Sequence, residues 1–139
     1  MDDRLLAAYR RTDYRVRLPG GGTACLHIDA ALPEALRPWV GTGPWGLITA
    51  WHPGSQPAPA VVNRAAQRRL LNILRADPGT RRILVAAGVG AGCWREPSLF
   101  AIGTPHGSLG RLAYAFGQLA HLAGTGPGPV RLVWTAELT

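Results

Sequence analysis

The chain contains no lysine, so arginine supplies all of its 15 basic residues against 8 acidic ones. The formal net charge is +7 and the isoelectric point lies near 11.0. Because the arginines are spread along the chain and form no basic tail, this excess is typical of a solvated surface and only weakly indicates nucleic-acid binding. The absence of lysine also excludes a Walker-type phosphate loop, which requires one.

Cysteine is nearly as scarce, with Cys25 and Cys93 at no metal-binding spacing. Two thiols in a chain of 139 residues argue against a disulfide scaffold and for a reducing compartment. No apolar run approaches the roughly 18 residues that a membrane-spanning helix needs, and the acidic start MDDR is unlike a signal peptide. We therefore expect a cytoplasmic protein with no membrane segment, metal site or cofactor.

The composition is that of a globular protein, with 47% hydrophobic and 17% charged residues. A length of 139 residues corresponds to one ordinary domain. We predict a single domain over residues 1–139, in which residues 1–44 form an N-terminal helix, a β-hairpin and a short helix. Residues 45–134 form the main unit.

Two short alternating segments, YRVRL and ACLHI, flank the turn PGGG and predict the N-terminal hairpin. Asp2 and Asp3 favour a short helix before it, because acids stabilise the first turn of a helix. A second short helix follows Pro33.

The main unit reads strand, helix, strand, strand, helix, strand. Helical spacing of Val62, Ala66, Leu70 and Ile73 predicts the first helix, with these side chains facing the core. This order predicts an α+β fold with a ferredoxin-like split βαβ (βαββαβ) antiparallel sheet and both helices on one face. The strands are expected at 45–51, 81–90, 97–103 and 130–134, and the helices at 62–74 and 109–122.

Polar residues gather in the loop at residues 52–59, which leads into the first of these helices. We expect the first and third strands of the unit to lie side by side and parallel, so that both helices begin at one edge of the sheet. The loop 103–107 and the strand starts at Arg81, Arg82 and Arg131 would share that edge. Helix N-termini and arginines together favour an anion. Alternatively, the serines of these loops only cap helices and the arginines are only solvated.

A second polar cluster consists of Glu96, beside Trp94 and Pro97, and Gln118, which interrupts an apolar helix. A buried glutamate near a glutamine is a candidate ligand-binding pair or general acid–base. The alternative is a glutamate paired with arginine and a glutamine that satisfies a backbone group. The expected topology puts Glu96 at the opposite edge from His52, and the sequence leaves open whether the two clusters form one site.

Four segments carry a family resemblance: TDYRV, ITAWHPGSQP with the Asn and Arg that follow at 63–64, WREPSLFAIG, and FGQLA. With these segments in this order, the chain resembles the bacterial family known as domain of unknown function 3293. The resemblance implies a small bacterial cytoplasmic domain and brings no established activity. Together with the loop argument, it makes the following residues candidate ligand-binding positions: Trp51, His52, Ser55, Gln56, Asn63, Arg64, Glu96, Ser98 and Gln118.

The favoured hypothesis is a small-molecule or anion-binding (nucleotide-like) module that uses the 52–64 loop. One alternative is nucleic-acid binding through the arginine-rich surface, although the exposed aromatic pattern of an RNA-binding sheet is missing. Another is a structural domain that forms a homodimer. Whether the protein is an enzyme stays open, because Glu96 or His52 could act as acid or base but no nucleophile–base–orienter set accompanies them.

Overall fold

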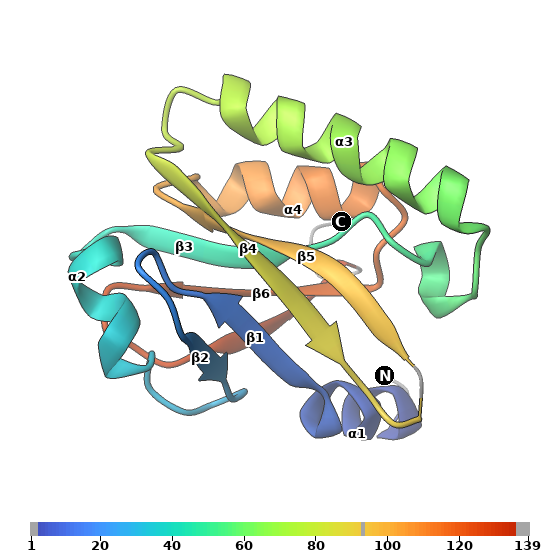
Figure 1. Cartoon of the computed structure of the whole chain (residues 1–139), viewed down its shortest axis with the longest axis horizontal. Helices are drawn as coiled ribbons and strands as arrows, with labels where there is room; N and C mark the ends of the chain where they lie inside the picture. Colours follow the sequence, from blue (N-terminus) through green and yellow to red (C-terminus); the bar gives the residue numbers. More distant parts are fainter. Residues whose placement is uncertain (1–2, 93, 136–139) are drawn as a thin grey trace.

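The computed structural model describes residues 3–92 and 94–135, which fold into a curled half-barrel sheet with helices on both sides (Figure 1). Asp2 and Cys93 lie outside the described residues. The strands are β1 (Asp13–Arg17), β2 (Thr23–Leu26), β3 (Pro44–Ile48), β4 (Arg82–Val89), β5 (Arg95–Ile102), β6 (Ala120–Thr125) and β7 (Arg131–Trp134). The α-helices are α1 (Asp3–Arg11), α2 (Arg37–Val40), α3 (Ala60–Ala76) and α4 (His106–Ala115), and two 3₁₀ turns are η1 (Glu34–Leu36) and η2 (Pro53–Ser55). The α+β class is confirmed.

All strand pairs are antiparallel within the described sheet, whose order is β2-β1-β4-β5-β3-β6-β7. The predicted hairpin is confirmed as β1 and β2, with Tyr14 opposite Leu26. Strand β1 also pairs with β4, so the N-terminal segment extends the same sheet. Among the described residues, no helix is long and apolar enough to cross a membrane.

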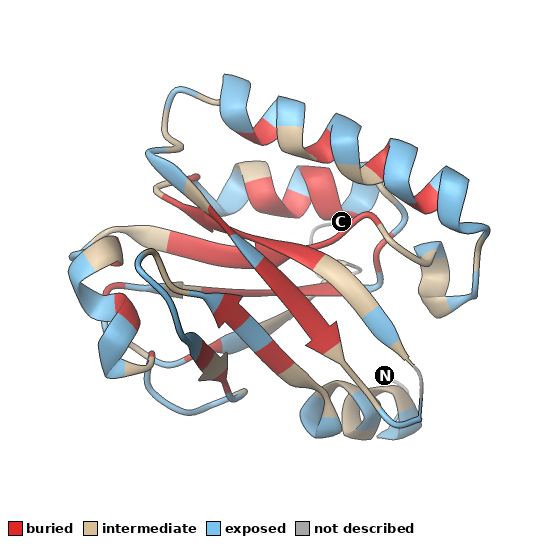
Figure 2. Ribbon diagram, in the orientation of Figure 1, coloured by how far each residue is buried: buried red, intermediate tan, exposed pale blue. Residues whose placement is uncertain are grey.

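Helices α3 and α4 cover one face of the sheet, as predicted (Figure 1). The inner stripe of α3 is Asn63, Ala66, Leu70 and Leu74, and it shows as the buried face of that helix in Figure 2. Leu70 is fully buried as expected. Two positions of the expected stripe are wrong: Val62 is 53% and Ile73 is 46% exposed. The stripe is displaced because the first inward position of the helix belongs to Asn63, whose side chain binds the preceding loop.

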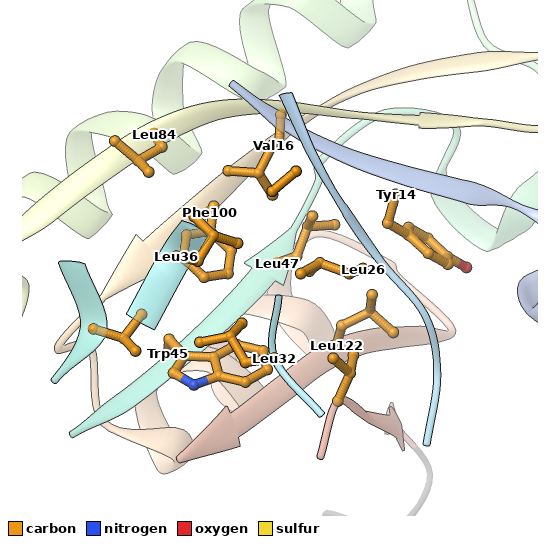
Figure 3. Packing of buried hydrophobic residues seen from close by; sticks show 14 of the residues in the cluster. Tyr14, Val16, Leu26, Leu32, Leu36, Trp45, Leu47, Leu84, Phe100 and Leu122 are labelled. Atoms are coloured by element: carbon orange, nitrogen blue, oxygen red, sulfur yellow. The ribbon is translucent and has the colours of Figure 1, made fainter. Parts of the chain in front are cut away.

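The concave face of the sheet carries the larger core cluster, shown in Figure 3. Trp45 and Phe100 are fully buried there, with ring centroids 5.6 Å apart. The Trp45 indole nitrogen donates a hydrogen bond to the backbone oxygen of Gly126 at 2.8 Å, so the one polar atom of this ring is satisfied. Tyr14 lies at one end of the cluster (Figure 3), and this end leads to the candidate site described below.

The predicted helix over 109–122 is wrong at its C-terminal end. Helix α4 stops at Ala115, because Gly117 takes a left-handed conformation (φ 68°) and its N–H bonds back to the Tyr114 oxygen. Residues 120–125 then form β6, which pairs with both β3 and β7. The final strand is confirmed as β7, but it lies at the edge of the sheet beyond β6.

The expected parallel pairing of the first and third strands is also wrong. Strands β3 and β5 are neighbours, but they are antiparallel, with Trp45 opposite Ile102 and Ile48 opposite Leu99. Helices α3 and α4 therefore begin at opposite ends of the sheet, and the loops 52–59 and 103–107 do not share an edge. Arg81, Arg82 and Arg131 lie at the end where α4 begins. The end of β3 lies instead beside the start of β5, which brings the 52–59 loop towards Glu96.

Candidate functional site

A cavity of about 720 Å³ opens at the concave end of the sheet, where β3 ends and β5 begins. Its apolar part is continuous with the core and includes Leu47, Leu122 and the ring of Tyr14. Helix α1, turn η2 and the connections before β5 and β6 form the rest of its wall. This volume is in the range of small-molecule binding sites in proteins.

Glu96 is one of two acidic residues that line the cavity, the other being Asp13. It projects to the same face of β5 as Ser98 and Phe100, since side chains alternate along a strand. Burial raises the pKa of its carboxyl from 4.5 to about 7, and the nearby Trp94 side chain partly opposes that shift. In the described part of the chain the ion pairs are Arg10–Asp29 and Arg15–Asp13, so Glu96 is not paired with an arginine there.

Two tyrosines stand close to this carboxyl. The Tyr14 hydroxyl donates to the backbone oxygen of Tyr9 at 2.8 Å, and the side chain of Ser55 lies close enough to the Tyr9 hydroxyl to lower its pKa. Burial raises the pKa of both phenols, and the nearby Glu96 raises them further. Both hydroxyls therefore stay protonated at neutral pH. The Tyr9 ring is held edge-on against Trp134, with centroids 5.6 Å apart.

The η2 loop is fixed by Asn63, which is 1% exposed. Its side-chain oxygen accepts from the His52 N–H at 3.0 Å, and its side-chain nitrogen donates to the Ala58 oxygen at 3.0 Å. The Ala58 N–H donates to Nδ1 of His52 at 3.2 Å, so that nitrogen acts as an acceptor. These bonds hold His52 and Ser55 in left-handed backbone conformations (φ 48° and 60°) that are rare outside glycine. The result is a rigid loop that presents Ser55 to the cavity.

Buried amides secure the remaining connections. Gln118 donates to the Trp51 oxygen at 3.1 Å and to the Phe116 oxygen at 3.3 Å, which ties the turn before β6 to the end of β3. Gln67 accepts from the Ala50 N–H at 2.8 Å and donates to the Pro97 oxygen at 3.0 Å. The strands that flank the cavity are thus cross-linked by side chains as well as by the sheet itself.

The candidate residues divide into three groups in the structure. Ser55, Glu96, Ser98 and Gln118 line the cavity, so the two predicted clusters adjoin one another. Trp51, His52 and Asn63 support the loop from behind, and the ring of His52 lies 4.6 Å from that of Trp94. Gln56 and Arg64 are exposed and do not line the cavity. The cavity residues that the sequence did not suggest include Tyr9, Asp13, Tyr14, Trp94 and His121.

The fold and this cavity define a small α+β protein with a polar, ring-lined cavity of ligand size. Residues 48–120, a little over half of the chain, match the family described as protein of unknown function (DUF3293), and the chain belongs to that family. Comparisons with curated proteins and with solved structures give no match. The matched segment contributes Ser55, Glu96 and Gln118 to the cavity, whereas Tyr9 and Tyr14 precede it.

Replacing Glu96 with glutamine is expected to change the pH dependence of stability. A carboxyl whose pKa is about 7 in the folded protein and near 4.5 when unfolded stabilises the fold fully below pH 4.5. That contribution is lost as the pH rises from 4.5 to 7, because the unfolded chain gives up its proton first. With partial solvation of the site allowed for, the free energy of unfolding of Glu96→Gln relative to wild type should rise by about 2 kcal/mol between pH 4.5 and pH 8.

Urea unfolding at both pH values measures this difference. Glu34→Gln is the matched control, since Glu34 is exposed in η1 and lies outside the cavity. Its stability relative to wild type should stay constant over the same range. Identical pH profiles for the two variants would contradict the assignment of Glu96 as a buried carboxyl.

Proposed function

We propose that this protein is a small-molecule-binding module whose ligand occupies the cavity between α1, η2 and the start of β5. One observation carries the proposal: the four segments that mark the family resemblance all contribute to the wall of this one cavity. TDYRV contributes Tyr14, the loop after β3 contributes Ser55, WREPS contributes Glu96 and FGQLA contributes Gln118. These segments lie far apart in the sequence, and a purely structural role would not require them to meet around open space.

The chemistry of the wall supports the proposal. Buried space that serves only packing is filled by apolar side chains. Here hydroxyl, carboxyl and amide groups of Tyr9, Ser55, Glu96 and Gln118 border the open volume beside an apolar floor. A few polar groups on an apolar background are typical of sites that orient a small ligand.

The rigidity of the wall also favours binding. The Gly54 N–H donates to the Gly117 oxygen at 2.7 Å, which joins η2 to the turn before β6, and Asn63 fixes the remainder of the loop. Donors and acceptors that are already in place lose less conformational entropy when a ligand arrives. The anionic, nucleotide-like ligand suggested by the sequence loses its main support, because the two helix N-termini that were to attract it lie at opposite ends of the sheet.

A cavity-blocking variant tests the proposal. Ala8 is exposed on α1 and lines the cavity, so Ala8→Trp should obstruct it without disturbing the core. Ala65→Trp is the control, since Ala65 is exposed on α3 and lies outside the cavity. In ligand-detected NMR with a panel of small polar compounds, we expect some to bind wild type and Ala65→Trp, and to lose binding in Ala8→Trp. Equal binding to all three proteins, or no binding to any, would overturn the proposal.

We also infer that residues 44–125 are organised as a ferredoxin-like unit. The contiguous order β4-β5-β3-β6 supports this, as does the way α3 and α4 each connect two strands that have one strand between them. In this arrangement β6 takes the place that was predicted for the last strand of the unit. An experimental structure with β3 and β4 antiparallel to each other would contradict it.

A further inference from the structure

Two acidic residues line the cavity: Asp13 pairs with Arg15, whereas Glu96 lies among aromatic rings. Glu96 on β5, Tyr9 on α1, Tyr14 on β1 and Trp94 before β5 all line the cavity, and they come from three parts of the chain. The Trp94 side chain lies close enough to the Glu96 carboxyl to lower its pKa, and the charge of Glu96 raises the pKa of both tyrosines. The three rings are therefore grouped around Glu96.

Charged groups of the surrounding elements also face the cavity, but no ion pair among the described residues involves Glu96. On β1, Arg15 pairs with Asp13 at 3.2 Å, which offsets its charge. On β6, burial and the nearby His106 lower the pKa of His121 to about 4, so its ring is neutral at neutral pH. Arg11 lines the cavity from the exposed end of α1, where it is open to solvent, and no ion pair joins it to Glu96.

We propose that the ligand of this cavity carries a protonated amine, held by the Glu96 carboxylate against the rings of Tyr9, Tyr14 and Trp94; this rests on the function proposed above. An ionised carboxylate in a partly dry site is costly when it has no counter-charge. An ammonium group supplies that charge, and the faces of tyrosine and tryptophan rings attract cations as well. The apolar floor at Leu47 and Leu122 then accepts the carbon skeleton of the same ligand.

The proposal predicts that the affinity for an amine increases as the pH rises. In the empty cavity burial holds the pKa of Glu96 at about 7, and a bound ammonium ion lowers it again. Binding an amine near or below neutral pH therefore releases a proton from the protein. Since only the ionised carboxylate attracts the cation, affinity should rise on the order of tenfold between pH 5.5 and pH 8. A simple alkylamine stays protonated over this whole range, as a lysine side chain does.

Isothermal titration calorimetry with four probes tests the inference: n-butylamine, tetramethylammonium, n-butanol and butyrate, each at pH 5.5 and pH 8. We expect both cations to bind wild type more tightly than the alcohol or the carboxylate, and more tightly at pH 8. Glu96→Gln should weaken n-butylamine binding at pH 8 at least about tenfold and remove its pH dependence. Glu34→Gln, an exposed position outside the cavity, should bind as wild type does.

The outcomes separate this inference from the proposed function. If n-butanol or butyrate binds best, and Ala8→Trp abolishes that binding, the cavity is a ligand site but the amine preference is wrong. Amine binding that persists in Glu96→Gln, or that is equal at the two pH values, overturns the role of Glu96. If none of the four probes binds and the wider compound panel also fails, both proposals are overturned.

Discussion

Leu70→Asp is expected to reduce the free energy of unfolding by more than about 4 kcal/mol, which is enough to unfold a domain of ordinary stability. Leu70 is fully buried on the inner face of α3, in the same cluster as Ile48, Leu74 and Leu109. The substitution removes the apolar contacts of a whole side chain and places a charge where no cation faces it. Circular dichroism and urea unfolding measure the effect.

Ile73→Asp is the matched control on the same helix. Its hydrophobic spacing suggested an inward position, but Ile73 is 46% exposed. An aspartate there can stay hydrated, so the variant should lose no more than about 1 kcal/mol. If Ile73→Asp were the more damaging of the two, the orientation of α3 on the sheet would be wrong.

This pair shows how far hydrophobic spacing predicts a helix face. Ala66, Leu70 and Leu74 lie inward, as the apolar residues of a surface helix do. The first turn departs from the pattern, because Asn63 occupies the inward position that Val62 was expected to take. Its amide is satisfied by His52 and Ala58, which belong to the preceding loop. The spacing of apolar residues carries no information about such hydrogen bonds, so the inward position of Asn63 could not be predicted from it.

The predicted helix over 109–122 extended beyond the end of α4 for a different reason. Residues 109–123 are almost continuously apolar, and such a run is compatible with either a helix or a buried strand. Gly117 was the available signal, since a glycine in the left-handed region commonly ends a helix. The strand that follows is fixed by its pairing with β3 and β7 on both sides. These pairings join residues that are far apart in the sequence, so the propensity of the segment alone does not reveal them.

Of the residues that line the cavity, the sequence suggested Ser55, Glu96, Ser98 and Gln118 and did not suggest Tyr9 or Tyr14. Ser55, Glu96 and Gln118 could be identified because polar residues in apolar or proline-rich surroundings stand out in a sequence. Tyr9 and Tyr14 belong to an amphipathic helix and an alternating strand, where an aromatic residue ordinarily packs in the core. They reach the cavity because β1 joins the sheet beside β4, which puts α1 across its open end.

The relative direction of β3 and β5 determines which loops border the cavity. With β3 and β5 taken as parallel, Glu96 and the 52–59 loop were placed at opposite edges of the sheet. The antiparallel register, with Ile48 opposite Leu99, brings the end of one strand to the start of the other. The two clusters, which the expected topology placed at opposite edges, therefore border the same cavity.

Gly124→Ala is expected to lower the free energy of unfolding by about 3 kcal/mol, although it adds a single methyl group. The Cα of Gly124 lies directly against the ring of Trp45, and a Cβ at this position would overlap that ring. The ring has little room to move, because its nitrogen is bonded to the Gly126 oxygen and Phe100 packs against it. Gly88→Ala in β4 is the control, since its Cβ would meet the Thr12 methyl group at an ordinary 3.5 Å. It should change stability by less than about 1 kcal/mol.

A double-mutant cycle shows whether the cost of Gly124→Ala comes from this one overlap. Trp45→Leu on its own should be destabilising, because it leaves a cavity and an unbonded carbonyl at Gly126. In the Trp45→Leu background, however, the new methyl group occupies vacated space. Gly124→Ala should then cost less than about 1 kcal/mol, a coupling of roughly 2 kcal/mol between the two sites. If the full cost of the alanine persisted without the indole ring, the packing of Trp45 against β6 would not be what requires glycine at position 124.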